Sequence, residues 1–247
     1  DVTQPHGVRV ELIQGDDLPP GDDMRLTLDE IGAVNMAPIL GNNVVDTYPK
    51  EFFQGLKAWC EEKGALLIYD DVQAGGGRCG YYATWQHPEV GVKPDITCLG
   101  KGIALGWPMS MVLADDSIAE VMTPGTHFNS MAGSDWVCSM SQYFLDWLGE
   151  NLPEVRTRGD EIKQRLVDHS WIEASDGYGF MLAFTPDWDG YDGYQLCKAA
   201  QDMGLLICTW RPFGPVRFNP PLNITPEDLD RAFDILDKAH KVAKGVK

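Results

Sequence analysis

A lysine flanked by two glycines, Lys101, directly follows an apolar segment that reads DITCLG. An amine beside a wall that excludes water has a lowered pKa and can attack a carbonyl carbon as a nucleophile. The two glycines would let a bulky ligand approach the backbone closely. The alternative is a solvent-exposed lysine in an ordinary turn, and Lys101 alone does not separate the two.

Two carboxylates, Asp70 and Asp71, end a second apolar segment, and a glycine-rich loop follows them. Ligands of open α/β sheets bind at the carboxyl ends of the strands. Strand alternation sends Asp70 and Val72 to one face and Asp71 and Gln73 to the other. A carboxylate buried there needs a cation or a hydrogen-bond donor to remain ionised. An ordinary strand-to-loop turn with its acids in water is the alternative.

Lys101 and the carboxylate some thirty residues upstream suit one chemistry in combination. Pyridoxal phosphate (PLP) needs a lysine that holds its aldehyde as a Schiff base and a carboxylate that keeps its pyridine nitrogen protonated. The pair therefore predicts a PLP site with Lys101 and Asp70 as catalytic residues.

Three segments resemble the signature of the class III aminotransferases, a family of PLP enzymes of fold type I. They read LLIYDDVQAGGGRCG, VKPDITCLGKG and GWP, in the family's order and spacing. The resemblance implies that Lys101 forms the Schiff base and that Asp70 is the partner of the pyridine nitrogen. It further implies that Val72 packs on the cofactor ring and that Gln73 hydrogen-bonds the phenolic oxygen. Asp71 stands where the family usually has Glu.

Two looser matches extend the resemblance. The segment HFNSMAGS places Ser130 on a family threonine that reaches the cofactor phosphate of the neighbouring subunit, unless it is an incidental loop serine. The segment VRFNPPL places Arg217 on the arginine that binds the substrate carboxylate as a bidentate fork, unless it is a surface arginine. Asn42 stands where many ω-aminotransferases have a glutamate that pairs with that arginine, so the masking charge is absent here.

The resemblance implies transfer of an amino group from an amine, an ω-amino acid or a diamine, to a 2-oxo acid. One alternative is a PLP-dependent racemase or epimerase of the same family. Another is an inactive, truncated paralogue that acts as a binding subunit. The expected partners are the small-molecule amine and oxo acid and a second copy of the chain in a homodimer.

The resemblance covers nearly the whole chain but only about the C-terminal half of the family. The N-terminal half of the family supplies a phosphate cradle and an aromatic that stacks on the pyridine ring. We therefore expect this half to be supplied either covalently or by another chain.

The elements needed to position these residues alternate along the chain. Continuous apolar or alternating runs predict strands at residues 8–13, 31–40, 65–71, 95–100 and 109–114, then 179–185 and 205–210. Apolar spacing predicts helices at residues 49–64, 135–168, 193–204 and 226–246. The order predicts an α/β fold: part of a large, mostly parallel-sheet domain over residues 1–150 and a small α+β domain over 151–247.

Composition excludes several classes of protein. The 247 residues carry a net charge of −17, which repels phosphate backbones and argues against nucleic-acid partners. The sequence contains neither an apolar run long enough to span a membrane nor Cys or His spacing typical of a metal site. The six cysteines are expected to be mostly buried thiols in a reducing compartment. The first residues do not resemble a signal peptide, and we expect a cytoplasmic protein.

Overall fold

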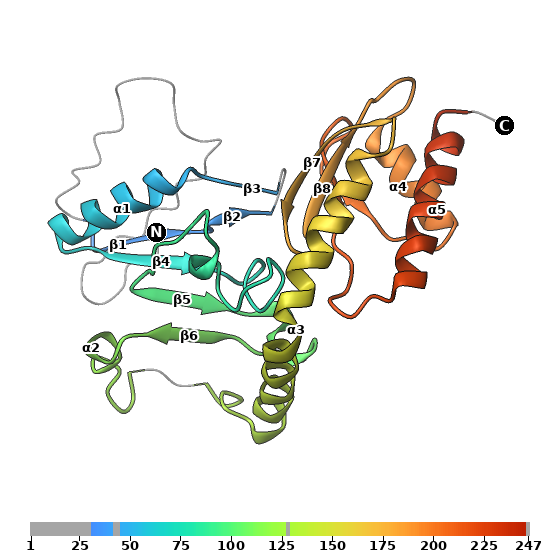
Figure 1. Ribbon diagram of the computed structural model, residues 1–247. Coiled ribbons are helices and arrows are strands. Elements are labelled where there is room, and N and C mark those ends of the chain that lie inside the picture. The colour runs from blue at the N-terminus through green and yellow to red at the C-terminus, as the bar shows by residue number, and fades with distance from the viewer. Residues whose placement is uncertain (1–30, 42–44, 127–128, 246–247) are drawn as a thin grey trace.

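The computed structural model describes residues 31–41, 45–126 and 129–245, and these residues form two sheets joined by one long helix (Figure 1). The first sheet has the strand order β1-β4-β5-β6, and the second has the order β7-β8-β10-β9. The strand expected at residues 8–13 lies outside the described residues, as does Asn42.

The first sheet is mostly parallel. Its strands are β1 (Ala33–Met36), β4 (Leu66–Asp70), β5 (Ile96–Leu99) and β6 (Met111–Ala114). Strand β4 pairs in parallel with β1 and β5, as the crossover prediction requires, whereas β6 pairs antiparallel with β5. The β5–β6 connection holds only a short 3-10 turn, Lys101–Ala104, and no crossover helix, so β6 runs back beside β5.

The prediction of one continuous buried strand over residues 31–40 is wrong. Strand β1 ends at Met36, and β2 (Ile39–Leu40) forms a separate two-stranded sheet with β3 (Asp46–Thr47). Pro38, which has no backbone N–H for a sheet hydrogen bond, separates the two strands. Residues of β1 alternate between exposed and half-buried, because β1 is an edge strand of the first sheet.

Helix α1 (Lys50–Lys63) confirms the predicted helix and covers one face of the first sheet (Figure 1). Its buried side chains Phe53 and Cys60 pack in one hydrophobic cluster with Leu67 and Tyr69 of β4. The helix ends at Gly64, whose φ of 68° is the left-handed conformation of a C-cap glycine. The helix thereby fixes β4, the strand that carries Asp70.

Helix α3 (Asp135–Val167) links the two sheets as one uninterrupted helix of 33 residues. A short helix, α2 (Asp116–Ala119), precedes it. The predicted domain boundary between residues 150 and 151 falls inside α3 and stays a prediction.

The second sheet is antiparallel and packs on α3 and on two further helices. It consists of β7 (Ile172–Tyr178), β8 (Met181–Pro186), β9 (Cys208–Thr209) and β10 (Val216–Phe218), with α4 (Gly193–Asp202) and α5 (Pro226–Ala243). The predictions at β8, α4 and α5 are confirmed, whereas β9 is shorter than expected and β7 and β10 were not predicted. Thr225 caps α5, its Oγ1 accepting from the Asp228 N–H at 3.1 Å.

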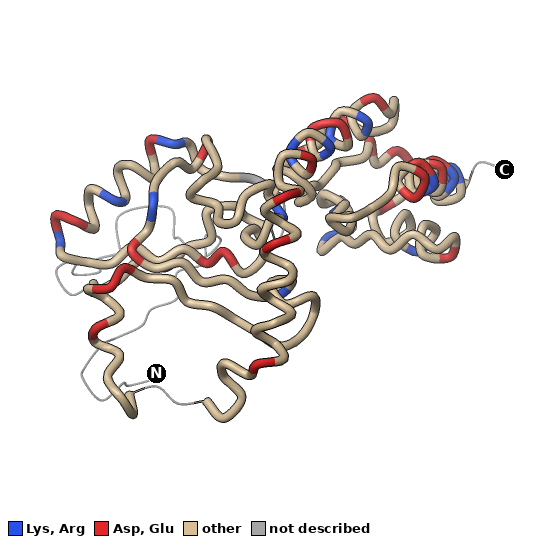
Figure 2. Tube along the Cα trace, turned by 60° about the horizontal axis from the view of Figure 1, so that its bottom comes forward, with Lys and Arg blue, Asp and Glu red and all other residues tan. Residues whose placement is uncertain are grey.

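The described residues contain no helix long and apolar enough to cross a membrane, and no cluster of His, Cys, Asp or Glu suited to a metal ion. Figure 2 shows acidic residues distributed along α1, α3 and α5, mixed with basic ones. Of the six free cysteines, two are buried, two half-buried and two exposed, so the prediction of mostly buried thiols is wrong.

Candidate active site

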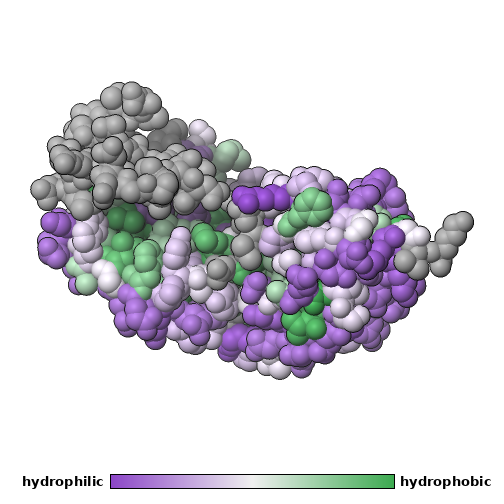
Figure 3. All heavy atoms as spheres, turned by 90° about the horizontal axis from the view of Figure 1, so that it is seen from above, coloured by the Kyte–Doolittle hydropathy of each residue, from purple (hydrophilic) through white to green (hydrophobic). Residues whose placement is uncertain are grey.

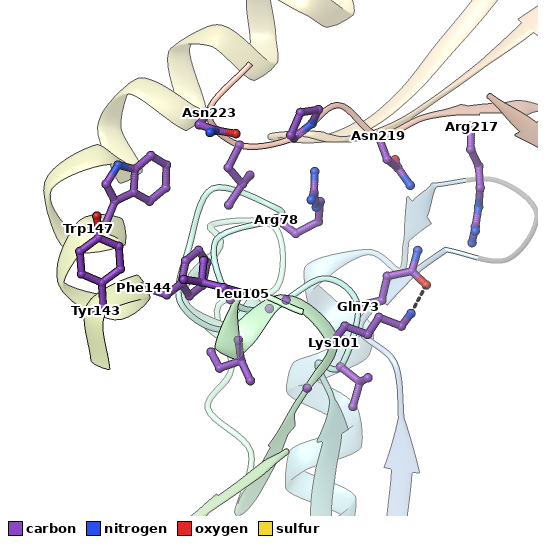
Figure 4. Close-up of a pocket in the computed structure, with 18 residues that line it drawn as sticks. Gln73, Arg78, Lys101, Leu105, Tyr143, Phe144, Trp147, Arg217, Asn219 and Asn223 are labelled. Atoms are coloured by element: carbon purple, nitrogen blue, oxygen red, sulfur yellow. Dashed lines mark hydrogen bonds between the residues drawn. The ribbon is translucent and has the colours of Figure 1, made fainter. Parts of the chain in front are cut away.

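A pocket of about 690 Å³ lies between the carboxyl ends of β4 and β5, the first half of α3, and β10 with the turn after it (Figure 4). Its lining includes three basic residues and, among the described residues, no acidic one. The basic residues are Arg78, Lys101 and Arg217. The chain has a net charge of −17, yet the described charged residues of this lining are all basic, which suits the pocket to an anionic ligand.

Lys101 begins the 3-10 turn after β5 with a φ of 50°, a left-handed conformation that is uncommon for a lysine. Its Nζ donates a hydrogen bond to Gln73 Oε1 at 2.9 Å (Figure 4). Burial lowers the pKa of the Lys101 amine, the nearby positive charge of Arg217 lowers it further, and Asp70 opposes both. The amine is therefore closer to its neutral, nucleophilic form than a free lysine is.

Val72 and Gln73 both line the pocket. Strand alternation predicts opposite faces for them, but β4 ends at Asp70 and the chain turns immediately afterwards, so both side chains reach the pocket. A Cβ on Gly100 would lie 3.2 Å from Val72 Cγ1, which shows how closely the backbone before Lys101 approaches Val72.

Asp70 lies beside the pocket rather than in its lining. The side chain is exposed, and its Oδ1 accepts a hydrogen bond from the Val72 N–H at 3.1 Å. Its charge reaches the Lys101 amine, whose pKa it raises. The structure thus brings Asp70 next to Lys101 with a carboxylate that is open to a further partner.

Asp71 is fully buried and holds the loop after β4. Its two carboxylate oxygens accept hydrogen bonds from the Thr84 N–H, at 2.7 Å, and from the Thr84 hydroxyl. Burial raises the pKa of Asp71 to about 6, although the Thr84 hydrogen bonds act in the opposite direction. A buried carboxylate needs a donor, but the sequence does not identify Thr84 as that donor, because the contact between Asp71 and Thr84 forms only when the loop folds.

Arg217 lies in β10, paired with Ala183 of β8 and Cys208 of β9. Its Nε and Nη2 atoms are buried and have no hydrogen-bond partner among the described residues. A buried guanidinium without acceptors is costly, and a carboxylate is the acceptor that matches two adjacent N–H groups. In Figure 4 the side chain extends from β10 toward Gln73 and Lys101.

Arg78 was not predicted as a site residue. Its guanidinium donates hydrogen bonds to the Phe180 carbonyl at 3.3 Å and to the Pro220 carbonyl, and burial lowers its pKa. It therefore ties the loop after β4 to the second sheet, close to Arg217. Its place in the GGGRCG segment was a usable signal, but the partners lie more than a hundred residues away.

Ser130 is exposed, precedes α3 and does not line the pocket. The structure therefore brings Val72, Gln73, Lys101 and Arg217 together, with Asp70 adjacent, and leaves Ser130 outside. The aromatic wall that α3 contributes was not predicted either; it consists of Tyr143, Phe144 and Trp147.

The glycine-rich loop is packed too tightly for a side chain at Gly77. Its φ is 87°, and a Cβ there would lie 2.3 Å from Cδ1 of the fully buried Leu148 on α3. We expect Gly77→Ala to lower the free energy of unfolding by about 1–3 kcal/mol in urea denaturation, from overpacking and backbone strain.

Gly76→Ala is the matched control for that substitution. Gly76 also has a positive φ, 60°, but its Cβ would make only an ordinary contact of 3.6 Å with Ile103. It should cost clearly less than Gly77→Ala, and equal losses for the two variants would contradict close packing at Gly77.

Comparison with known proteins decides the family. The sequence model described as Aminotransferase class-III matches residues 22–240. The acetylornithine aminotransferase of Aquifex aeolicus is 35% identical over 214 residues, 86% of this chain and 54% of that protein. Ornithine aminotransferase 2 of Staphylococcus aureus is 34% identical over 86% of this chain and 54% of its own length. The chain belongs to the class III aminotransferase family.

Solved structures show the same fold. The ornithine aminotransferase of Toxoplasma gondii, in a crystal structure with partial occupancy of PLP at its active site, has a TM-score of 0.78 and 26% identity. The match covers 89% of this chain and 53% of that one. The acetylornithine aminotransferase of Elizabethkingia anophelis has a TM-score of 0.74 and 28% identity over 86% of this chain and 57% of its own. This class III chain thus spans about half the length of the relatives it matches.

Proposed function

We propose that this chain carries the lysine-bearing half of a PLP-dependent aminotransferase, which transfers an amino group from an amine to a 2-oxo acid. The observation that supports this most strongly is the shared pocket of Lys101 and Arg217. It places a hydrogen-bonded lysine amine of lowered pKa with an arginine edge that lacks a partner among the described residues.

The residues present fit PLP. Lys101 offers an amine to the aldehyde, Gln73 lies 2.9 Å from that amine, and Asp70 presents an open carboxylate beside both. When bound, PLP withdraws electrons from the substrate's Cα and so makes its proton acidic. Asp70 would hold the proton on the pyridine nitrogen, Gln73 would hydrogen-bond the phenolic oxygen, and Val72 would contact the ring.

Lys101 has two tasks in this proposal. Its Nζ would hold the cofactor's aldehyde and, when free, would accept the proton from the substrate's Cα and later give it up again. A lysine of lowered pKa is suited to this exchange because it gives up its own proton more readily than a free lysine does.

Arg217 would bind the carboxylate of the substrate. Its unpartnered Nε and Nη2 atoms suit a bidentate contact. Among the described residues, no acidic side chain lines the pocket to pair with Arg217 in place of the substrate. Asn42 in the sequence likewise lacks the charge that would mask this arginine, so it would be free in both half-reactions. We propose an ω-amino acid or a diamine as the donor.

The stoichiometry of the reaction tests this function. With PLP, 5-aminovalerate and 2-oxoglutarate, we expect one amino acid product for every oxo acid consumed, as measured by chromatography. Inversion of an amino acid without consumption of oxo acid would instead identify a racemase. Failure of the intact enzyme to develop the absorbance of a lysine–PLP Schiff base would indicate an inactive paralogue.

We further propose that a second polypeptide segment, corresponding to the unmatched half of the relatives, completes the first sheet. Parallel sheets normally have both faces covered. The face of this sheet opposite α1 carries apolar side chains that remain half-buried or exposed: Ile68, Ile96, Cys98 and Val112. Val112 is 68% exposed, and β6 pairs, among the described residues, only with β5.

The α1 side supports the same proposal. Figure 3 shows hydrophobic residues at the surface on this side of the molecule, among hydrophilic ones. On α1, Phe52 is 42% exposed and stacks on Tyr48 with ring centroids 4.5 Å apart. Such exposed apolar surface is typical of an interface.

Assembly can be tested by sedimentation of the 247-residue chain with PLP titrated in. Because Ser130 would serve the site of a neighbouring subunit, we propose a homodimer that also contains the unmatched half. We expect the chain alone to aggregate or to bind PLP weakly. A well-folded monomer that binds PLP tightly would contradict the need for both.

A further inference from the structure

The guanidinium of Arg217 has an aromatic neighbour, Trp210. Arg217 Cζ lies over the Trp210 ring, 5.6 Å from its centroid. This is within the range of a cation–π contact, in which the flat face of a guanidinium stacks on an indole. The edges of the guanidinium, where its N–H groups point, stay available for other partners.

The loop that carries Trp210 is held by bonds that do not involve the indole. Tyr194 Oη donates to the Trp210 carbonyl at 3.2 Å. The Thr209 hydroxyl lies 2.9 Å from the Arg211 carbonyl and 3.0 Å from the Pro215 carbonyl. Truncation of the Trp210 side chain therefore leaves the anchors of the loop in place.

Burial does not account for a tryptophan at this position, because Trp210 is 61% exposed. Trp210 does contact Arg217. Among the described residues, Arg217 is the only arginine of the pocket that has buried guanidinium atoms without a hydrogen-bond partner. The indole contact and the unpartnered N–H groups are complementary, because a contact at Cζ restricts where the guanidinium lies and leaves Nε and Nη2 available for another partner.

We propose that Trp210 is a positioning residue for Arg217 and thereby a determinant of specificity for substrates with a terminal carboxylate. By stacking on the guanidinium, the indole orients the Nε–Nη2 edge for bidentate binding of that carboxylate. The inference rests on the proposed function, since it assigns a carboxylate to Arg217. It adds that the chain selects this group through an arginine of fixed orientation.

Calorimetric titration with glutarate tests this without relying on turnover. The assembled enzyme and its variants are titrated with glutarate and, as a control lacking carboxylates, with 1,5-pentanediol. We expect Arg217→Ala to abolish glutarate binding and Trp210→Ala to weaken it about three- to tenfold, as a partly exposed cation–π contact would. Trp210→Phe should restore it to within about twofold, because phenylalanine keeps an aromatic face.

Phe213→Ala is the matched control, since Phe213 is a 68% exposed aromatic of the same loop whose ring contact is with Trp188. It should bind glutarate like the parent chain. Glutarate affinity unchanged in Trp210→Ala but lost in Arg217→Ala would overturn the role of Trp210 and leave the proposed function intact.

Two further outcomes separate the remaining possibilities. Glutarate binding that survives Arg217→Ala would overturn the carboxylate site itself, and the inference with it. Equal weakening in Trp210→Ala, Trp210→Phe and Phe213→Ala, with a lowered melting temperature in each, would show a merely structural role and overturn the inference. In the active enzyme, Trp210→Ala should raise KM for 5-aminovalerate but not for pentylamine, with kcat little changed.

Discussion

Replacing Lys101 by alanine should lower the rate of amino transfer by at least about 10²–10⁴-fold, the contribution of a well-placed general acid–base group. The variant loses both the amine that would anchor PLP and the base that would move the Cα proton. The fold should be preserved, because the only described hydrogen bond of the Lys101 side chain is to Gln73. The measurement is the rate of oxo-acid consumption in the assembled enzyme saturated with PLP.

Lys93→Ala is the matched control for this substitution. Lys93 precedes β5, whereas Lys101 follows it, and the Lys93 Nζ pairs with Asp115 at 2.9 Å outside the pocket lining. It should retain the full rate. Comparable rates for Lys101→Ala and Lys93→Ala would show that Lys101 has no role in the reaction.

Replacing Asp70 by asparagine should leave the fold intact and lower kcat by about 10²–10³-fold, the cost of removing one electrostatic contact at a reacting centre. An amide cannot hold the pyridine nitrogen of PLP protonated. Its oxygen can still accept the Val72 N–H that Asp70 now accepts at 3.1 Å. The measurement combines kcat with the unfolding midpoint of the same sample.

Asp71→Asn distinguishes this effect from a general loss of acid. Asp71 is buried against Thr84, so its amide variant leaves a buried N–H group without an assigned acceptor and should mainly reduce stability. A variant Asp70→Asn that binds PLP normally and turns over at nearly the parent rate would exclude the proposed role of Asp70.

Local motifs predicted the parts of the site that depend on short stretches of chain. Val72, Gln73 and Lys101 meet because β4 and β5 are parallel neighbours whose carboxyl ends share an edge, as the apolar runs indicate. Arg217 joins them although it lies in β10, a strand of three residues that was too short to show periodicity. Its resemblance to a family motif supplied what the pattern could not.

Contacts between distant segments could not be predicted from the sequence. The partners of Arg78 lie in the second sheet, and the donors to Asp71 lie thirteen residues ahead of it. The antiparallel direction of β6 depends on the turn at Lys101, and the exposure of β1 depends on its position at the sheet edge. Apolar runs specify a strand, but neither its direction nor what covers it.

Borohydride reduction of the PLP-loaded protein, followed by peptide mapping, tests whether Lys101 forms the Schiff base with PLP. Reduction fixes a lysine–PLP Schiff base as a stable pyridoxyl group on the lysine that formed it. We expect mass spectrometry to find this group on the peptide that contains Lys101. Labelling of Lys93, or of no lysine in protein that has bound PLP, would contradict it.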